Sequence, residues 1–249
     1  MTADTPLEDP VAEGDRVVDA ATERDLTVRK IGGTAIYDRS ETAREEPFAR
    51  SYRDVDFVGH RSEESDIESL MADLGYEPNE RFNTMRPHRL EYLDPEHDRK
   101  ADFILDRFRF SHAWSLADRL AVHDRTVPIE DLLLSKLQIA EVSDRDIRDS
   151  LAILAEYPVR EDAGTDAIDP SYVADLCRND WGLWKTLSIN IEKVREYLRE
   201  ESLPIDQDAV EDRLATLETA IDEVPKTLRW KLRSLLGERK RWYRRPELE

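Results

Sequence analysis

Cysteine is almost absent from this chain of 249 residues, because Cys177 is the only one. A single cysteine forms no disulfide within the chain, which favours a reducing compartment. We interpret Cys177 as a small, partly buried hydrophobic residue. The N-terminal stretch MTADTPLEDP lacks the basic start and apolar core of a signal peptide. No apolar run approaches the roughly 18 residues that span a bilayer. We therefore expect a cytoplasmic protein with no membrane partner.

Positive charge is scarce relative to negative charge. The chain holds 37 Lys and Arg against 56 Asp and Glu, for a formal net charge of −19, and 37% of its residues are charged. Such an acidic surface opposes nucleic-acid binding. Dense carboxylates that stay hydrated under strong salt screening are typical of a halophilic cytosol. We interpret the chain as halophilic, and its 39% hydrophobic residues still provide a core.

The hydrophobic pattern changes character near residue 128. The first part predicts an α+β fold, with helices over residues 9–24 and 62–74, an exposed loop or short helix at 38–51, and strands over 27–37, 52–58, 81–93 and 100–105. The second part predicts helices over residues 129–142, 144–157, 171–178, 181–200 and 207–236, with a loop over 158–170. We therefore expect a mixed or antiparallel sheet with flanking helices in residues 1–127, followed by a helical region in residues 128–249.

Two aspartates alternate with apolar residues in the segment YRDVDFVG. On a strand, Asp54 and Asp56 would point to one face, roughly 7 Å apart, while Val55 and Phe57 would face the core. Adjacent carboxylates repel unless a cation joins them, and Mg²⁺ is commonly held by one or two carboxylates plus substrate phosphates. Asp102, on another short apolar strand, is a candidate third ligand, and three carboxylates can bridge two metal ions. The alternative is a polar strand face in a very acidic protein.

A glycine pair precedes the aspartates. Gly32 and Gly33 would let the main chain approach a ligand closely and offer N–H groups to anionic oxygens. Either a Gly-Gly pair or an Asp-x-Asp pattern is common by itself. Their order along the chain, followed by a lone strand aspartate, favours a phosphate and metal site.

The segments KIGGTAIY, YRDVDFVG, KADFIL, IEDLLLSKLQ and DRDIRDSLAIL together resemble the nucleotidyltransferase superfamily related to DNA polymerase β. The nearest branch is that of the AbiEii-like and MenT-like toxin nucleotidyltransferases. The resemblance covers roughly residues 28–154. It implies a nucleotidyltransferase-like fold and two Mg²⁺ ions, with Mn²⁺ as a substitute. It also implies transfer of a nucleoside monophosphate from an NTP to a hydroxyl of RNA, protein or a small molecule, within a toxin–antitoxin pair.

The resemblance also implies roles for individual residues. Metal binding and catalysis fall to Asp54, Asp56 and Asp102. Nucleotide binding falls to Gly32, Gly33, Thr34 and Arg53, together with Lys136, which is also counted as catalytic. Positioning of the acceptor falls to Arg145, Asp146 and Asp149. The plain alternative is an ordinary surface lysine for Lys136 and a cap or ion pair for the two aspartates.

The C-terminal stretch reverses the acidic trend. Residues 226–249 hold nine Lys or Arg and three Glu, a net charge of +6 that leaves −25 for the remainder. Trp230, Trp242 and Tyr243 are interleaved with the basic residues. Such a strip suits phosphate contacts and base stacking, so tRNA is a candidate acceptor. The alternative is a helix that balances the charge of the acidic body.

Two rival functions stay open at this level. The first is a non-catalytic binding protein or antitoxin-like partner that keeps the fold, with its carboxylates as a solvated acidic face. The second is an RNA-binding accessory without chemistry, for which residues 226–249 would be indispensable.

Overall fold

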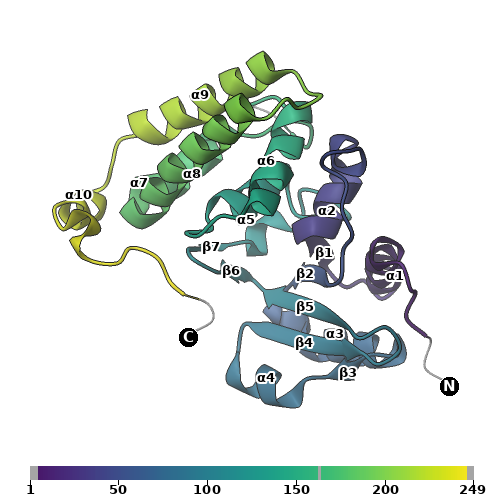
Figure 1. Cartoon of the computed structure of the whole chain (residues 1–249). Helices are drawn as coiled ribbons and strands as arrows, with labels where there is room; N and C mark the ends of the chain where they lie inside the picture. Colours follow the sequence, from purple (N-terminus) through teal and green to yellow (C-terminus); the bar gives the residue numbers. More distant parts are fainter. Residues whose placement is uncertain (1–4, 162–163, 246–249) are drawn as a thin grey trace. The chain divides into compact units, whose positions relative to one another are not determined.

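The computed structural model describes residues 5–161 and 164–245, which form two compact units (Figure 1). The first unit runs to Arg39 and includes Arg50–Phe108 and Ser115–Pro128, whereas the second holds Ser40–Ala49, Arg109–Trp114 and the described residues from Ile129 onward. Two segments that the sequence placed in the first part therefore belong to the second unit.

Buried contacts explain why one of these segments, Ser40–Ala49, joins the second unit. Glu156 accepts hydrogen bonds from the Ser40 hydroxyl at 2.7 Å and from the Thr42 N–H at 2.5 Å. Ala43 and Phe48 are buried. The expected exposed loop is thus partly an apolar anchor, with a short 3₁₀ helix, η1 (Thr42–Arg44), in the middle.

The first unit is built on a five-stranded mixed sheet of order β1-β2-β5-β4-β3. Only the central pair, β2 and β5, is parallel, and the other neighbours are antiparallel. The strands are β1 (Val28–Ile31), β2 (Val55–Gly59), β3 (Glu77–Pro78), β4 (Arg89–Asp94) and β5 (Arg99–Leu105). This arrangement confirms the predicted α+β class.

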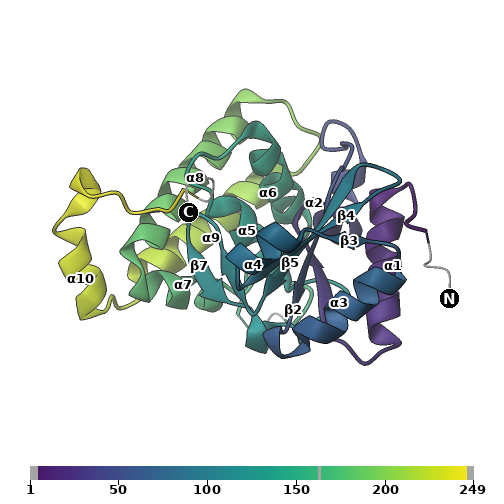
Figure 2. The ribbon, with the colours of Figure 1, turned by 90° about the horizontal axis from the view of Figure 1, so that it is seen from below.

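Helices α1 (Pro10–Thr22) and α3 (Glu64–Asp73) lie beside each other in the first unit (Figure 2). Their buried apolar side chains form part of its core. The Asp9 side chain caps α1 by accepting from the Ala12 N–H at 2.9 Å, and Pro10 occupies the first turn, as the sequence predicts. The rings of Phe57 and Phe103 stack at 4.8 Å between centroids on neighbouring strands. This packing fixes which face of β2 and β5 is buried.

Two predicted strands of the first unit are partly helical. The strand expected over residues 27–37 ends at Ile31, because Gly32 adopts a φ of 75° and α2 (Gly32–Arg39) begins there. The strand expected over residues 81–93 is preceded by α4 (Glu80–Met85), whose N-terminus is capped by Asn79. The chain also forms the short elements η2 (Arg61–Glu63) and η3 (Ala117–Arg119) and a two-stranded sheet of β6 (Arg107–Arg109) and β7 (Ala113–Ser115).

The second unit is helical, as expected, and α7, α8 and α9 lie side by side (Figure 1). Its helices are α5 (Ile129–Leu137), α6 (Asp144–Glu156), α7 (Pro170–Asn179), α8 (Trp181–Glu200), α9 (Gln207–Glu223), α10 (Leu228–Ser234) and η4 (Gly237–Arg239). The single helix expected over residues 207–236 is wrong, because Pro225 separates α9 from α10. Residues 162–163 of the expected loop and 246–249 of the basic stretch lie outside the described residues.

The helices of the described part include none that is both long and apolar enough to cross a bilayer. Cys177 is fully buried in α7, in line with its interpretation as a small hydrophobic residue, and burial raises the pKa of its thiol.

Candidate functional site

A row of carboxylates crosses three neighbouring strands of the first unit. Asp56 on β2 pairs in register with Asp102 on β5, and Asp102 pairs with Glu91 on β4. Paired residues on neighbouring strands share a face of the sheet, about 4.8 Å apart between strands. Phe57 and Phe103 take the opposite, buried face. The structure therefore brings Asp56 and Asp102 together on one face, as the candidate site requires.

Asp54 lies one residue before β2 and is exposed. Its Oδ1 accepts a hydrogen bond from the main-chain N–H of Lys100 at 3.2 Å, which anchors the carboxylate to the start of β5. Within the part of the chain that the structure describes, no three His, Cys, Asp or Glu side chains gather as a metal-binding group. Asp54 is thus anchored by the β5 main chain next to the Asp56–Asp102 pair, and its place in a metal site of three carboxylates stays a prediction.

Two basic side chains accompany the row. Arg89 Nη2 lies 2.8 Å from Asp102 Oδ1, and its guanidinium is stacked over the Phe82 ring at 5.3 Å. Lys100 Nζ lies 2.9 Å from Glu91 Oε2. Burial raises the pKa of Asp102 above its usual value, although Arg89 opposes this effect. Burial would also raise the pKa of Glu91, but hydrogen bonds from Lys100 and Asn79 outweigh it and lower that pKa.

A bare stretch of main chain adjoins Asp56 at the start of α2. A Cβ at Gly32 would lie 2.7 Å from Asp56 Oδ2, and the φ of 75° at this position favours glycine. A Cβ at Gly33 would meet Arg50 and the Tyr52 ring. The Arg50 guanidinium lies 4.3 Å from the centroid of the Tyr52 ring. The first turn of α2 therefore places its N–H groups and a guanidinium near a strand carboxylate.

Two further residues expected to bind nucleotide differ in their surroundings. Thr34 is only 1% exposed, and its Oγ1 is a buried oxygen for which the described residues provide no hydrogen-bond partner. Arg53 is exposed, directly before Asp54. A buried hydroxyl without a partner is costly, so an orphaned oxygen in the first turn of α2 is consistent with a turn that binds a ligand.

The residues present fit a divalent cation bound together with a polyphosphate. Mg²⁺ keeps several waters and takes one or two carboxylates plus substrate phosphates, rather than a cage made only of protein groups. Asp56 and Asp102 supply the two carboxylates. At the glycine turn the side chains of Asp56, Arg50 and Tyr52 lie so close to the main chain that a Cβ on either glycine would clash with them.

The residues expected to assist from the helical part form a group within the second unit. Lys136 Nζ lies 2.8 Å from Asp149 Oδ2 and 3.5 Å from Asp146 Oδ1. Asp146 also closes a capping box with Ser143 at the start of α6. Arg145 is exposed. The structure thus shows the ion pair and the cap that were the plain alternative, and a role for Lys136 at a nucleotide stays a prediction.

Three residues gain importance that the sequence did not give them. Glu91 had no signal, because it stands in a segment with mixed helix and strand character. For Arg50 and Arg89 the sequence alone leaves open whether they line a triphosphate or acceptor site or form surface ion pairs. The strand register singles out Glu91 and Arg89, and the packing against Gly33 singles out Arg50. Both features depend on contacts between residues far apart in the sequence.

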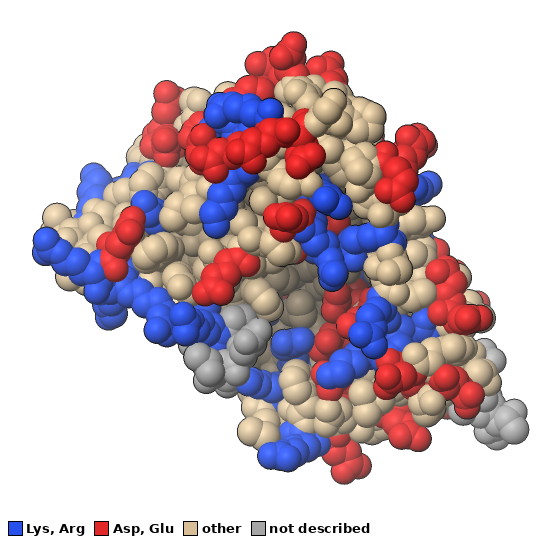
Figure 3. All heavy atoms as spheres, in the orientation of Figure 1, with Lys and Arg blue, Asp and Glu red and all other residues tan. Residues whose placement is uncertain are grey.

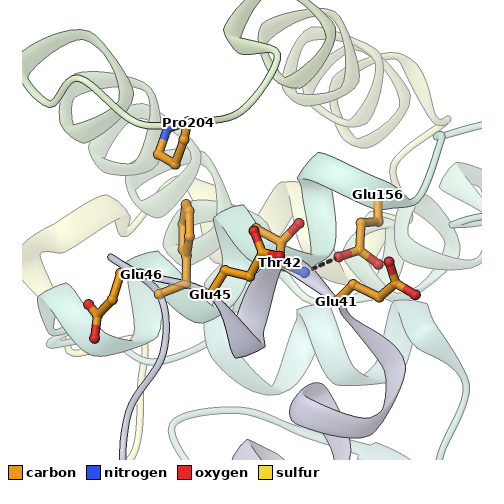
Figure 4. Close-up of a pocket in the computed structure, with 7 residues that line it drawn as sticks. Glu41, Thr42, Glu45, Glu46, Glu156 and Pro204 are labelled. Carbon is orange, nitrogen blue, oxygen red and sulfur yellow. Dashed lines mark hydrogen bonds between the residues drawn. The ribbon is translucent and has the colours of Figure 1, made fainter.

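The second unit contains a pocket of about 280 Å³ (Figure 4). It is lined by Glu41, Thr42, Glu45, Glu46, Phe48, Glu156 and Pro204. The Glu156 carboxylate is already engaged by Thr42 and Ser40. None of the residues predicted for catalysis lines this pocket, so we do not assign the candidate site to it.

Five chains of solved structures match this chain, among them ANT(2'')-Ia and LnuA. The antibiotic-resistance factor ANT(2'')-Ia shares 15% identity at a TM-score of 0.40, over 57% of this chain and 81% of its own. The lincosamide antibiotic adenylyltransferase LnuA, bound to lincomycin, shares 14% identity at a TM-score of 0.41, over 56% of this chain and 92% of its own. No protein-family model and no curated protein matches the chain.

Proposed function

We propose that the first unit carries a metal-dependent nucleotidyltransferase site. It would transfer a nucleoside monophosphate from an NTP to an acceptor hydroxyl and release pyrophosphate. The observation that supports this most is the in-register pairing of Asp56 with Asp102, next to the bare first turn of α2. Carboxylates that share a sheet face beside a glycine turn provide both a cation site and a phosphate site.

Each residue has a defined task in this proposal. Asp56 and Asp102 hold the divalent cations, Asp54 completes the carboxylate set, and two Mg²⁺ ions (or Mn²⁺) are expected. The ions supply charge neutralisation to the phosphate oxygens. The N–H groups of Gly32 and Gly33 bind the triphosphate.

The chain's own groups then orient the reactants. Arg50 would add positive charge next to Gly33, and Asp102 would accept the proton of the acceptor hydroxyl. Holding the reactants in line and stabilising the charge that develops provide most of the catalysis in such transfers. Thr34 and Arg53 stay predicted nucleotide contacts. An RNA end, a protein or a small molecule stays the predicted acceptor, and a toxin–antitoxin role stays predicted from the resemblance.

A non-catalytic binding protein is the second candidate, and one observation favours it. Arg89 and Lys100 already neutralise Asp102 and Glu91 without a metal ion. A face whose carboxylates are balanced in this way is stable as a plain protein surface. The two candidates differ in whether a cation and a nucleotide bind at Asp56 and Asp102.

Titration calorimetry with Mg²⁺ and each of ATP, GTP, CTP and UTP separates the two candidates. An enzyme binds at least one Mg²⁺–NTP complex, and Asp56→Asn or Asp102→Asn weakens that binding more than about tenfold, roughly 1.4 kcal/mol. Asp66→Asn, an exposed aspartate on α3, is the control of equal charge change. Equal affinity in all four proteins, or no binding by the wild type, contradicts the proposed site.

A further inference from the structure

Helix α10 has an inner face that packs on α8. The Trp230 ring meets the Trp184 ring edge to face at 5.3 Å between centroids. The Arg233 guanidinium lies 4.5 Å from the centroid of the Trp181 ring and donates to the main-chain oxygens of Gly237 and Lys240. These contacts fix the rotation of α10 about its own axis.

The opposite face of α10 is apolar and exposed. Leu235 and Leu236 keep helical backbone angles beyond Ser234, so the helical spacing continues through them. At about 100° per residue, four leucines fall within an arc of roughly 100°. Their exposed fractions are 73% for Leu228, 58% for Leu232, 78% for Leu235 and 49% for Leu236. Exposed leucines grouped in this way mark an interaction surface.

Basic side chains border the leucines on both sides. Arg229 and Lys231 are exposed at the two margins of the apolar arc, and the exposed residues Arg239, Lys240 and Arg241 follow. Glu238, the acidic residue among them, is paired with Lys185 at 2.8 Å. Figure 3 shows Lys and Arg gathered over α10 and the segment that follows it. We call the leucines, Arg229 and Lys231 the α10 outer face.

Two aromatic residues of this stretch, Trp230 and Trp242, are engaged within the protein. Trp230 packs on Trp184, while Trp242 contacts Trp181 at 6.1 Å between centroids and donates its Nε1–H to the Thr186 hydroxyl at 3.0 Å. A nucleic-acid strand would supply negative charge but would leave the leucines uncovered. The occupant of the outer face must offer negative charge and apolar surface together.

We propose that the α10 outer face binds an anionic lipid surface. The leucines would enter the boundary between headgroups and acyl chains, while the stems of Arg229 and Lys231 extend along it and carry their charges to anionic headgroups. A helix that lies in a layer of anionic headgroups has negative charge on both sides, so Arg229 and Lys231 are neutralised at the same time. A protein groove would need an acidic rim on each side of one apolar channel.

The rest of the chain carries a net charge of −25, and its repulsion of an anionic surface acts only over short distances. Exposed charges interact weakly beyond the Debye length, which is about 8 Å at physiological ionic strength. This inference departs from the expectation of no membrane partner, which rested on the lack of a spanning segment. A peripheral contact through α10 needs none, and it is independent of the proposed nucleotide site.

Vesicle flotation of the full chain tests the proposal. Vesicles of equal parts phosphatidylglycerol and phosphatidylcholine should bind the chain, whereas vesicles of phosphatidylcholine alone should not. Replacing Arg229 and Lys231 by Gln together should lower the affinity about 30-fold. Leu232→Ser with Leu235→Ser should lower it more than about tenfold. Leu93→Ser, an exposed leucine on β4, is the matched control and should bind like the wild type.

The replaced leucines are exposed, so the variants should keep the wild-type circular dichroism and melting temperature. Failure of the wild type to float with anionic vesicles overturns the proposal. So does binding that depends on the basic residues but not on the leucines, which indicates a purely electrostatic contact. Binding of an RNA oligonucleotide or an acidic protein through this face, without vesicle binding, overturns it as well.

Discussion

Replacing Gly32 by Ala tests how closely the α2 turn approaches Asp56. An L-residue at a φ of 75° costs about 1–2 kcal/mol in backbone strain. The added Cβ would lie 2.7 Å from Asp56 Oδ2, which forces the carboxylate to move and adds roughly 1–3 kcal/mol. We therefore expect Gly32→Ala to lower the free energy of unfolding by about 2–5 kcal/mol. We also expect it to weaken Mg²⁺–NTP binding more than about tenfold.

Gly237→Ala is the control, because Gly237 has a φ of 51° and its Cβ would have no neighbour within 4 Å. Its free energy of unfolding should fall only by the backbone strain, about 1–2 kcal/mol, and its nucleotide affinity should stay unchanged. Urea unfolding, followed by circular dichroism and intrinsic fluorescence, gives the two stabilities, and calorimetry gives the affinities. Equal destabilisation by both variants, with nucleotide affinity intact in Gly32→Ala, would refute the contact between the turn and Asp56.

Three further predictions concern stability. His112 is 4% exposed, and burial lowers its pKa from 6.5 to about 4, so between these pH values the unfolded chain binds a proton that the folded chain does not. The free energy of unfolding should therefore fall by ~3 kcal/mol as the pH drops from 6.5 to 4. In urea unfolding at several pH values, His112→Gln should remove this part of the pH dependence. An unchanged slope would contradict the buried neutral imidazole. Arg195 forms ion pairs with Glu192, Glu211 and Glu218 at 2.7–2.9 Å. Arg195→Ala should therefore lower the free energy of unfolding by about 2–3 kcal/mol, and Arg195→Lys should lower it less. Equal losses of stability in the two variants would exclude the ion pairs as the cause. Raising KCl from about 0.1 to 1 M should raise the Tm of this acidic chain by screening self-repulsion, and a falling Tm would argue against the halophilic interpretation.

Helices with local signals were predictable from the sequence. Helix α6 follows from its apolar stripe and the Ser143 cap, and α8 matches its predicted range. Periodicity and capping residues act within a few positions, so a single segment carries the information. The alternation of Asp54 and Asp56 with Val55 and Phe57 located β2 for the same reason, although the strand proper begins at Val55.

Features that depend on distant contacts were not predictable. The apolar run after Gly32 suits a strand as well as a short helix, and the strand ends where Gly32 adopts a φ of 75° and α2 begins. The parallel register that sets Asp56 beside Asp102 arises only when β5 inserts next to β2. The Glu91–Lys100 and Arg89–Asp102 ion pairs follow from the antiparallel β4–β5 register, which no local pattern encodes.

The central claim is that Asp56 and Asp102 jointly hold divalent cations together with a nucleotide. Electron paramagnetic resonance of added Mn²⁺ measures this, by counting the free ion with and without each NTP and subtracting the Mn²⁺ that the NTP binds in the absence of protein. The wild type should bind about two Mn²⁺ ions per chain, and only when the nucleotide is present. Asp56→Asn and Asp102→Asn should both abolish that binding, while Asp66→Asn should retain it. Full Mn²⁺ binding by Asp102→Asn in the presence of the nucleotide would contradict the shared site.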